Sequence, residues 1–421
     1  MTTTCLVGEI QSFLTSDNVP YKSERAKLAL AQAQLADGSV TQALASFEEL
    51  EAKTTRAQFL VSYAKHLIAK GDNPQALDRL REANSLLTDD QSDLDRLNVT
   101  GLSQLIAETF AQADSNEEGR AILDGIASYR SRIPMNPMLL ALMLPVSKDL
   151  ADIGFREEAA TIVNETYGLV LDRELEITPE QALQIFEAWA SLDAATATKA
   201  AEDLAAIIRK DGPSTFEFAI WTGLSAGLIS SKVENTSFLE RAQSSFAAAP
   251  ERGAALLLVP KLSATMKQAG ENEKGRALLD KAYTEAATLA SPMEKTPVLL
   301  ALAEGFARAD DPEQAMKILK EILVMPEEAG TGGKMMRHYT YTVPAQLALL
   351  GKIDEAYDLA MKFDGGGRDM ALMMAADKLA VQGNYHEAMR FLSKIEGDIA
   401  VMMMAGIAER IANTSNQSKT P

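Results

Sequence analysis

The sequence predicts an all-α fold, namely a right-handed α-solenoid of about ten antiparallel helix pairs. First, 66 of the 421 residues are alanine and only 6% are aromatic, and alanine has the highest helix propensity. Second, Gly or Asp recurs along most of the chain at intervals of 32 to 43 residues, between two amphipathic segments. Third, small residues stand at fixed distances on both sides of these turn residues. A repeat of this length indicates stacked helical hairpins.

The turn residues mark where the first helix of each hairpin ends and the second begins. The segment from Leu60 to Leu80 reads as a helix, a turn at Gly71 and a second helix. The segment from Leu299 to Leu319 repeats this pattern, and its second helix opens at Pro312, a residue suited to the first helical position. The same turn position is expected at Gly38, Gly71, Asp114, Gly154, Gly270, Asp310, Gly351 and Gly383.

Small residues occupy two positions of this repeat, where two helices are expected to cross. Seven residues before the turns stand Ala31, Ala64, Ala107, Ser147, Ser263, Ala303, Pro344 and Ala376, all small except Pro344. Five residues after the turns stand Ala43, Ala76, Gly119, Ala159, Gly275, Ala315, Ala356 and Ala388. Four residues before the turn, seven of the eight copies have a bulky apolar residue, with Gln34 as the exception. Helices approach closely where the side chains between them are small, so these positions predict the contacts within each hairpin.

The best copies resemble the tetratricopeptide repeat, which has a small residue in its first helix, Gly at the turn and Ala in its second helix. The matching residues of the second copy are Tyr63, Ala64, Leu67, Gly71, Ala76, Leu80 and Ala83. Units of about 38–40 residues depart from the family's length of about 34 and also suit HEAT-type hairpins. The chain is interpreted as a divergent tetratricopeptide-like array. The resemblance implies a scaffold, an adaptor or a docking module.

The array is expected over residues 25–396, after an N-terminal cap segment at 1–24. Between Gly154 and Gly270 the turn is lost for 116 residues, which leaves room for two further hairpins. Residues 172–250 are therefore the degenerate part, where the array could break. Residues 397–412 are amphipathic with no turn after them, which predicts a C-terminal capping helix. The polar residues 413–421 are expected to be a disordered tail.

Composition and charge argue against several classes of protein. The formal net charge is −18, so nucleic acid, whose phosphates need a basic surface, is not an expected partner. Cys5 is the single cysteine, so no intramolecular disulfide, four-cysteine zinc site or iron–sulfur cluster can form. No apolar run reaches the roughly 18 residues that cross a bilayer, so membrane insertion is not expected. Residues 1–9 have neither the basic nor the apolar region of a signal peptide, so a cytoplasmic location is expected.

Two segments partly match motifs with known chemistry. Asp89 to Asp93 fits the carboxylate pattern that holds magnesium in all-helical prenyl-transfer enzymes, but no second acidic motif accompanies it. Gly330 to Lys334 resembles a phosphate-binding loop, but Glu328 stands where that loop needs its first Gly. The sequence therefore predicts no enzyme, no catalytic residue, no metal site and no cofactor. An all-helical enzyme with a magnesium site near Asp89–Asp93, or a purely structural array, is the alternative.

The expected partner is a protein or peptide, bound in the concave groove that the first helices of the hairpins would line. Counting back from the Gly351 turn places three residues on the first turns of such a helix, and the next hairpin contributes three at equivalent positions. The candidate partner-binding residues are Arg337, His338, Tyr341, Met370, Met373 and Asp377. Aromatic rings, thioethers and polar groups together are typical of an adaptable peptide site. The sequence does not predict the oligomeric state.

Overall fold

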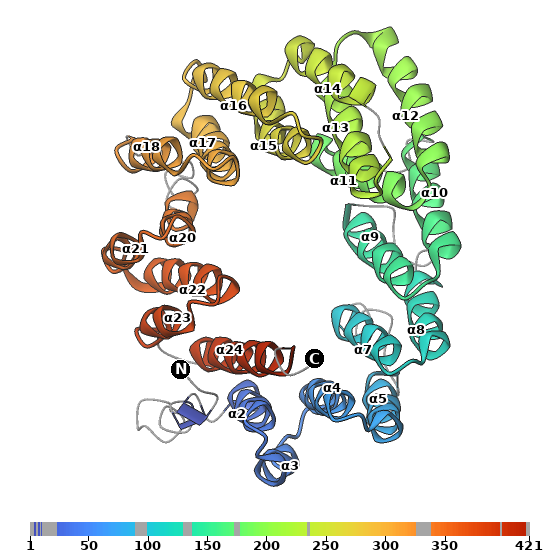
Figure 1. Ribbon diagram of the computed structural model, residues 1–421, viewed down its shortest axis with the longest axis vertical. Coiled ribbons are helices and arrows are strands. Elements are labelled where there is room, and N and C mark those ends of the chain that lie inside the picture. Colours follow the sequence, from blue (N-terminus) through green and yellow to red (C-terminus); the bar gives the residue numbers. More distant parts are fainter. Residues whose placement is uncertain are drawn as a thin grey trace. The chain divides into compact units, whose positions relative to one another are not determined.

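Figure 1 shows the chain in a computed structural model. The structure describes residues 4–5, 7–8, 10, 23–88, 99–128, 137–171, 177–233, 236–325, 338–395 and 398–417. The chain divides into two compact units. Unit 1 comprises Met1–Tyr129 and Ile353–Pro421, and unit 2 comprises Arg130–Lys352.

Unit 1 contains three helix pairs from the N-terminal part of the chain and the last helices of the sequence. Its helices are α2 (Glu24–Ala36), α3 (Val40–Glu48), α4 (Lys53–Ala69), α5 (Asn73–Thr88), α7 (Thr100–Gln112), α8 (Asn116–Ser128), α21 (Ile353–Ala360), α22 (Gly365–Val381), α23 (Tyr385–Leu392) and α24 (Asp398–Gln417). Helices α2 and α3, α4 and α5, α7 and α8, and α22 and α23 pack as antiparallel pairs. Helix α24 continues to Gln417, into the part of the sequence for which a disordered tail was predicted.

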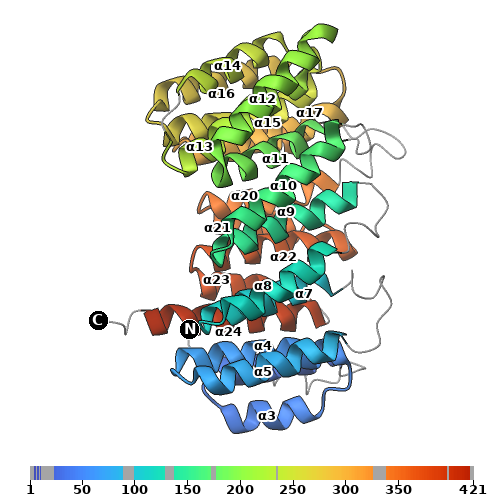
Figure 2. The same ribbon diagram turned by 90° about the vertical axis from the view of Figure 1, so that its right-hand side faces the viewer.

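The described residues of unit 2 form five further pairs. Its helices are α9 (Pro137–Asp152), α10 (Arg156–Leu171), α11 (Pro179–Leu192), α12 (Ala194–Ile208), α13 (Thr215–Ser230), α14 (Thr236–Ala248), α15 (Arg252–Gln268), α16 (Asn272–Ala286), α17 (Pro292–Arg308), α18 (Pro312–Leu323) and α20 (Val343–Leu349), with a short 3₁₀ turn, η2 (Arg209–Asp211). Figures 1 and 2 show consecutive pairs stacked side by side within the unit. The part of the chain that the structure describes has no β-strand. The predicted all-α solenoid of helix pairs is confirmed.

All eight predicted turn residues have left-handed backbone conformations, with φ between +59° and +103°. The turn at Gly71 shows why. The amide of Gly71 donates to the carbonyl of Ile68 at 2.9 Å, and the amide of Asp72 donates to that of Leu67 at 3.0 Å. This is the Schellman motif, which satisfies the last carbonyls of a helix and requires a left-handed residue, so glycine is favoured there. Leu67, the acceptor of the second hydrogen bond, is the residue four positions before the turn, where a bulky apolar residue was predicted. The same pair of hydrogen bonds recurs at the other seven turns.

The sixteen residues at these two positions, fifteen of them small, are all buried, as expected where paired helices touch. Ser263 of α15 and Gly275 of α16 show how close the approach is. The Ser263 hydroxyl donates to the carbonyl of Gly275 at 3.0 Å. A Cβ atom added to Gly275 would lie 2.9 Å from the Ser263 carbonyl oxygen. Small residues are therefore required for this crossing.

The stretch at 172–250 also forms two hairpins, α11/α12 and α13/α14. In the first of them Asp193 ends α11 and begins α12, and its carboxylate accepts from the amide of Thr196 at 3.0 Å, so no left-handed turn residue is needed. In the second the turn residue is Lys232, with φ of +60° and the same two Schellman hydrogen bonds. Helix α13 is buried almost along its full length.

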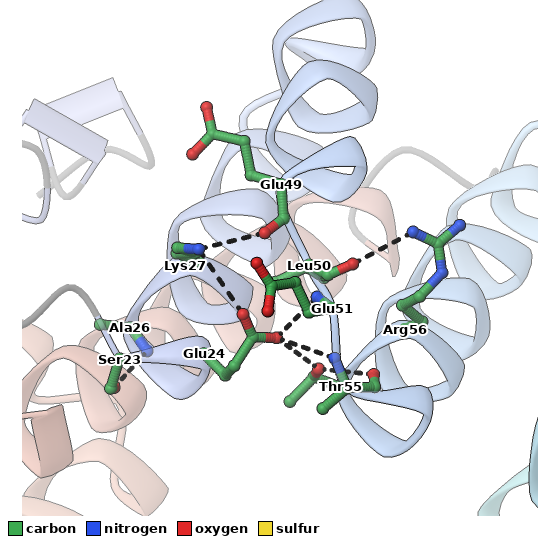
Figure 3. Close-up of polar contacts among 10 residues, drawn as sticks. Ser23, Glu24, Ala26, Lys27, Glu49, Leu50, Glu51, Thr55 and Arg56 are labelled. Atoms are coloured by element: carbon green, nitrogen blue, oxygen red, sulfur yellow. Dashed lines mark hydrogen bonds and ion pairs between the residues drawn. The ribbon is translucent and has the colours of Figure 1, made fainter.

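Glu24 of α2 fixes the start of α4, as Figure 3 shows. The first residues of a helix leave their amides without partners inside the helix. One carboxylate oxygen of Glu24 accepts from the amides of Glu51 and Ala52, at 3.0 and 3.2 Å, and from the Thr55 hydroxyl at 3.1 Å. Ala52, the N-cap residue of α4, makes no side-chain capping hydrogen bond of its own. The first helix of one hairpin therefore caps the first helix of the next.

Candidate functional site

The structure places the predicted partner-binding residues in both units. Arg337 lies outside the described residues. His338 and Tyr341 belong to unit 2 and precede α20, with their ring centroids 6.5 Å apart in an edge-to-face arrangement. His338 is exposed and Tyr341 is half-buried.

The other three residues of this prediction lie on α22 of unit 1. Met370, Met373 and Asp377 are spaced by three and four residues, so they share one face of the helix. Both methionines are half-buried, and the Asp377 carboxylate is 3.8 Å from the guanidinium of Arg410 on α24. Each half of the predicted patch is thus a local cluster. The complete six-residue site stays a prediction.

The larger candidate site is a groove in unit 2, with a volume of about 950 Å³. It lies on α9, α11 and the end of α13, the first helices of three consecutive hairpins, and Arg156 of α10 borders it. Helix α11 packs against both α9 and α13, so the faces of neighbouring first helices form one continuous surface. Its lining residues are Leu144, Pro145, Ser147, Lys148, Asp149, Ala151, Asp152, Arg156, Gln184, Glu187, Ala188, Ser191, Leu192, Ser230 and Ser231.

One backbone carbonyl ties three hairpins together at this groove. Ser191 lies in the last turn of α11, where carbonyls have no partner inside the helix. Its carbonyl oxygen accepts from the Arg156 guanidinium at 2.6 Å and from the Ser231 hydroxyl at 3.1 Å. A cation at the carboxyl end of a helix is also favoured by the helix dipole. This end of the groove is therefore held in a defined geometry.

Charged groups of both signs line the groove, and most of them are paired. Lys148 and Asp152 are one turn apart on α9 with 2.6 Å between their charged atoms. Glu187 of α11 pairs with Lys261 of α15 at 2.5 Å. Leu144, Ala188 and Leu192 add apolar surface. A surface that combines apolar area with local charges of both signs can bind the backbone and the mixed side chains of another polypeptide.

Two glycines position the helix that carries Glu187. A Cβ atom on Gly223 of α13 would lie 2.2 Å from the carbonyl oxygen of Leu183, and one on Gly227 would lie 2.3 Å from that of Glu187. The backbones of α11 and α13 therefore touch. This contact was not predicted from the sequence. The signal was present, because Gly223 and Gly227 are four residues apart and so share one face of a helix.

A second, smaller pocket of about 470 Å³ lies in unit 1 between α5, α7 and α8. Arg81 of α5 closes one side of it by a two-pronged ion pair with Glu118 of α8, at 3.0 and 2.8 Å. The hydrogen bond from Arg81 lowers the pKa of the Glu118 carboxyl. Because its charged lining is paired across neighbouring hairpins, we regard this pocket as part of their packing.

The predicted motifs with chemistry give no site in the described part of the chain. Asp89–Asp93 and Gly330–Lys334 both lie outside the described residues. Among the residues that are described, no three His, Cys, Asp or Glu side chains gather as metal ligands. No described helix is both long and apolar enough to span a membrane.

Comparisons with known proteins give matches at the level of the fold. No protein-family model and no curated protein sequence matches the chain. A Rap protein complexed with Competence and Sporulation Factor is 11% identical over 85% of this chain and 99% of its own, with a TM-score of 0.30. The pentatricopeptide repeat protein PPR10 from maize is 14% identical over 99% of this chain and 56% of its own, with a TM-score of 0.32. The human IFIT1 dimer with m7Gppp-AAAA is 15% identical over 93% of this chain and 72% of its own, with a TM-score of 0.26.

These matches correct one sequence-based expectation, the exclusion of nucleic acid as a partner. A helical-repeat protein bound to a capped oligonucleotide is among the structures that match. The exclusion was wrong because it used the net charge of −18, a sum over the whole chain. Nucleic acid meets a local surface, and a basic patch can exist on an acidic protein. The chain is similar to helical-repeat proteins, and at these identities the similarity shows the fold alone.

Proposed function

We propose that this chain is a non-catalytic binding scaffold whose unit 2 groove holds an extended segment of a partner polypeptide. We also propose that its hairpins are divergent tetratricopeptide-like repeats. The observation that carries the proposal is the groove across α9, α11 and α13. It crosses three hairpins, is anchored at the Ser191 carbonyl, and combines apolar surface with charges of both signs.

The chemistry of the groove favours a peptide over a small metabolite. A volume of about 950 Å³ is at the upper end of small-molecule sites, and the groove is lined by the faces of successive helices. Such surfaces recognise peptides through side chains at regular intervals. The similar Rap structure is a complex with Competence and Sporulation Factor, which is consistent with ligand binding by this type of fold.

The proposal is tested with a phage-displayed random peptide library panned against the immobilised full-length chain. An enriched peptide is then synthesised with a fluorophore, and its Kd is measured by anisotropy for three proteins. Ala188→Trp fills the groove, because Ala188 lines it. Ala206→Trp is the matched control, because Ala206 is exposed on α12 and does not line the groove. We expect roughly tenfold or greater weakening, about 1.4 kcal/mol, for Ala188→Trp alone.

Two outcomes would overturn the proposal. One is equal affinity of the peptide for the wild type and Ala188→Trp. The other is binding of a fluorescent oligoadenylate, lost in Ala188→Trp, with no peptide enriched from the library. The second result would assign the groove to nucleic acid.

A further inference from the structure

Helix α24, the last helix in the sequence, packs mainly on α2. Within unit 1, α24 makes most of its contacts with α2 and only a few with α22 and α23, which directly precede it in sequence. Figure 1 shows the two helices side by side. Helix α24 thus belongs structurally to the N-terminal hairpins.

Helix α2 is buried on two faces. Leu28, Ala31 and Leu35 belong to the core that α2 shares with α3, α4 and the following helices. Ala26, Ala29 and Ala33 are also buried but are not members of that core. Their spacing of three and four residues places them on one helical face. Since α3, α4 and α24 are the described helices with substantial contact to α2, we assign this alanine face to α24.

Helix α24 has a matching face. Its buried residues are Ala400, Val401, Met404, Ala405, Ile407 and Ala408. Met404 is 3% exposed, whereas Met402, two residues earlier, is 42% exposed. Small residues on both helices allow their axes to approach closely, and Met404 stands four residues from both Ala400 and Ala408 on the buried face of α24.

The position of α24 is the one that the first helix of a preceding hairpin would take. Helix α4 packs between α2 on one side and α7 on the other. Helix α2 packs against α4 on one side, and α24 occupies its other side. A repeat array exposes apolar surface at its ends unless a helix covers them. Here the C-terminal helix covers the N-terminal end.

We propose that the alanine face of α2 is a self-association surface, and that α24 of a second copy of this chain can dock there in place of the chain's own α24. The α2–α24 contact involves no covalent bond, so its interface is the same whether the two helices belong to one chain or to two. The choice depends on the effective concentration of the attached helix relative to that of a second molecule. Reciprocal exchange would give a closed dimer with two identical contacts.

The test uses two full-length variants that each disrupt the α2–α24 contact within the chain. One variant alters α24 and the other alters α2. Met404→Glu places a charge on the buried face of α24 and leaves α2 intact. Ala29→Glu places a charge on the alanine face of α2 and leaves α24 intact. Each variant alone should be a monomer by light scattering, with hydrogen exchange in residues 398–411 roughly tenfold or more faster than in the wild type. An equimolar mixture should form a 1:1 heterodimer, in which α24 of Ala29→Glu docks on α2 of Met404→Glu.

The matched control is Met402→Glu, the same substitution on the exposed face of α24. It should keep wild-type exchange, and it should form no heterodimer with Ala29→Glu because its own α24 covers α2. If Ala29→Glu loses its helical circular dichroism, Ala26→Glu takes its place as the second α2 variant. A mixture that stays monomeric, although both variants show fast exchange of α24, overturns the proposal. Wild-type exchange in Met404→Glu overturns the assignment of the contact itself.

Discussion

Glu187 of α11 and Lys261 of α15 form an ion pair with 2.5 Å between Oε1 and Nζ, although α13 lies between their helices in chain order. The pair links two hairpins that are not consecutive. Glu187 also lines the groove of unit 2, and its carbonyl is one of the atoms that Gly227 of α13 approaches. The burial of α13 and the placement of a groove charge are therefore consequences of the same packing.

The Glu187–Lys261 pair is expected to hold the Glu187 side chain in place in the groove and to contribute little to the stability of the fold. Both side chains are about one-third exposed, at 35% and 37%, and such pairs contribute only about 0.2–1 kcal/mol. Glu187→Lys should therefore lower the urea midpoint slightly while strongly weakening a peptide that binds the groove. Adding Lys261→Glu restores the pair with reversed charges. We expect it to recover the midpoint but not the peptide affinity, and full recovery of affinity would show that Glu187 does not face the ligand.

Gly223→Ala should lower the stability of this protein strongly, although it adds only one methyl group. The new Cβ atom would meet the Leu183 carbonyl oxygen at 2.2 Å, a backbone atom that cannot turn away. Separation of α11 from α13 should cost about 3 kcal/mol of unfolding free energy, measured by urea denaturation.

The control for that substitution is Gly125→Ala on α8. A Cβ atom there meets no atom within 4 Å, and alanine is the better helix former. It should leave stability unchanged or raise it by up to about 1 kcal/mol. A similar loss of stability in both variants would mean that α11 and α13 do not touch as described.

Ala64→Arg tests the predicted small position in the first helix of the second hairpin. Ala64 is fully buried, so arginine there would separate α4 from α5 and bury a charge. We expect a loss of about 3 kcal/mol or more in unfolding free energy. Ala69→Arg is the matched control, because Ala69 is exposed near the end of the same helix. Near-wild-type melting of Ala64→Arg would place the repeat in a different register.

The hairpins could be predicted from the sequence wherever one residue type is physically required. A left-handed turn favours Gly, and a close helix crossing needs Ala, Ser or Gly, so both positions recur visibly. Two further hairpins were expected between Gly154 and Gly270, but their turns were not located. Asp193 joins two helices without a left-handed residue, and Lys232 adopts the left-handed conformation without being Gly or Asp.

The groove could not be predicted from a single repeat. Its residues come from three hairpins, and the contacts of Arg156 and Ser231 with Ser191 span 35 and 40 residues. No local spacing encodes such contacts. The predicted patch at His338 and Met373 was obtained by counting residues from the turns of the repeat. Such counting predicts which face of a helix a residue occupies, but it does not predict which residues of neighbouring hairpins lie beside that face.

Lys232 and Gly71 occupy equivalent turn positions, and substitutions there should change the unfolding free energy in opposite directions. Non-glycine residues in the left-handed region cost roughly 1 kcal/mol or more. Lys232→Gly should therefore raise the unfolding free energy by about 1 kcal/mol, because Lys232 is exposed and its φ is +60°. Gly71→Ala should lower it by a similar amount, since φ is +80° there and no atom obstructs the new Cβ. Equal effects of both substitutions on thermal melting would contradict the assigned turn geometry.

Glu24 makes stability depend on pH. Partial burial acts to raise the pKa of its carboxyl, but hydrogen bonds from the Ala52 and Glu51 amides and the Thr55 hydroxyl, together with the charge of Lys27, lower the pKa below its ordinary value of 4.5. The pKa is therefore lower in the folded chain than in the unfolded chain. Stabilisation by this carboxylate is fully present above about pH 4.5 and is lost as the pH falls through the lower folded-state value.

Glu24→Gln keeps the shape and one acceptor oxygen of the side chain but removes its charge, so it isolates this contribution. At pH 7 the variant should be less stable by about 1 kcal/mol, the size of a typical helix-capping contact. The difference in urea midpoint between wild type and variant should shrink steadily below pH 4.5. Glu49→Gln, an exposed position in the same hairpin, should show a much smaller difference at pH 7. A Glu24→Gln difference that is constant from pH 7 to the acid limit would mean that the charge of Glu24 does not hold the start of α4.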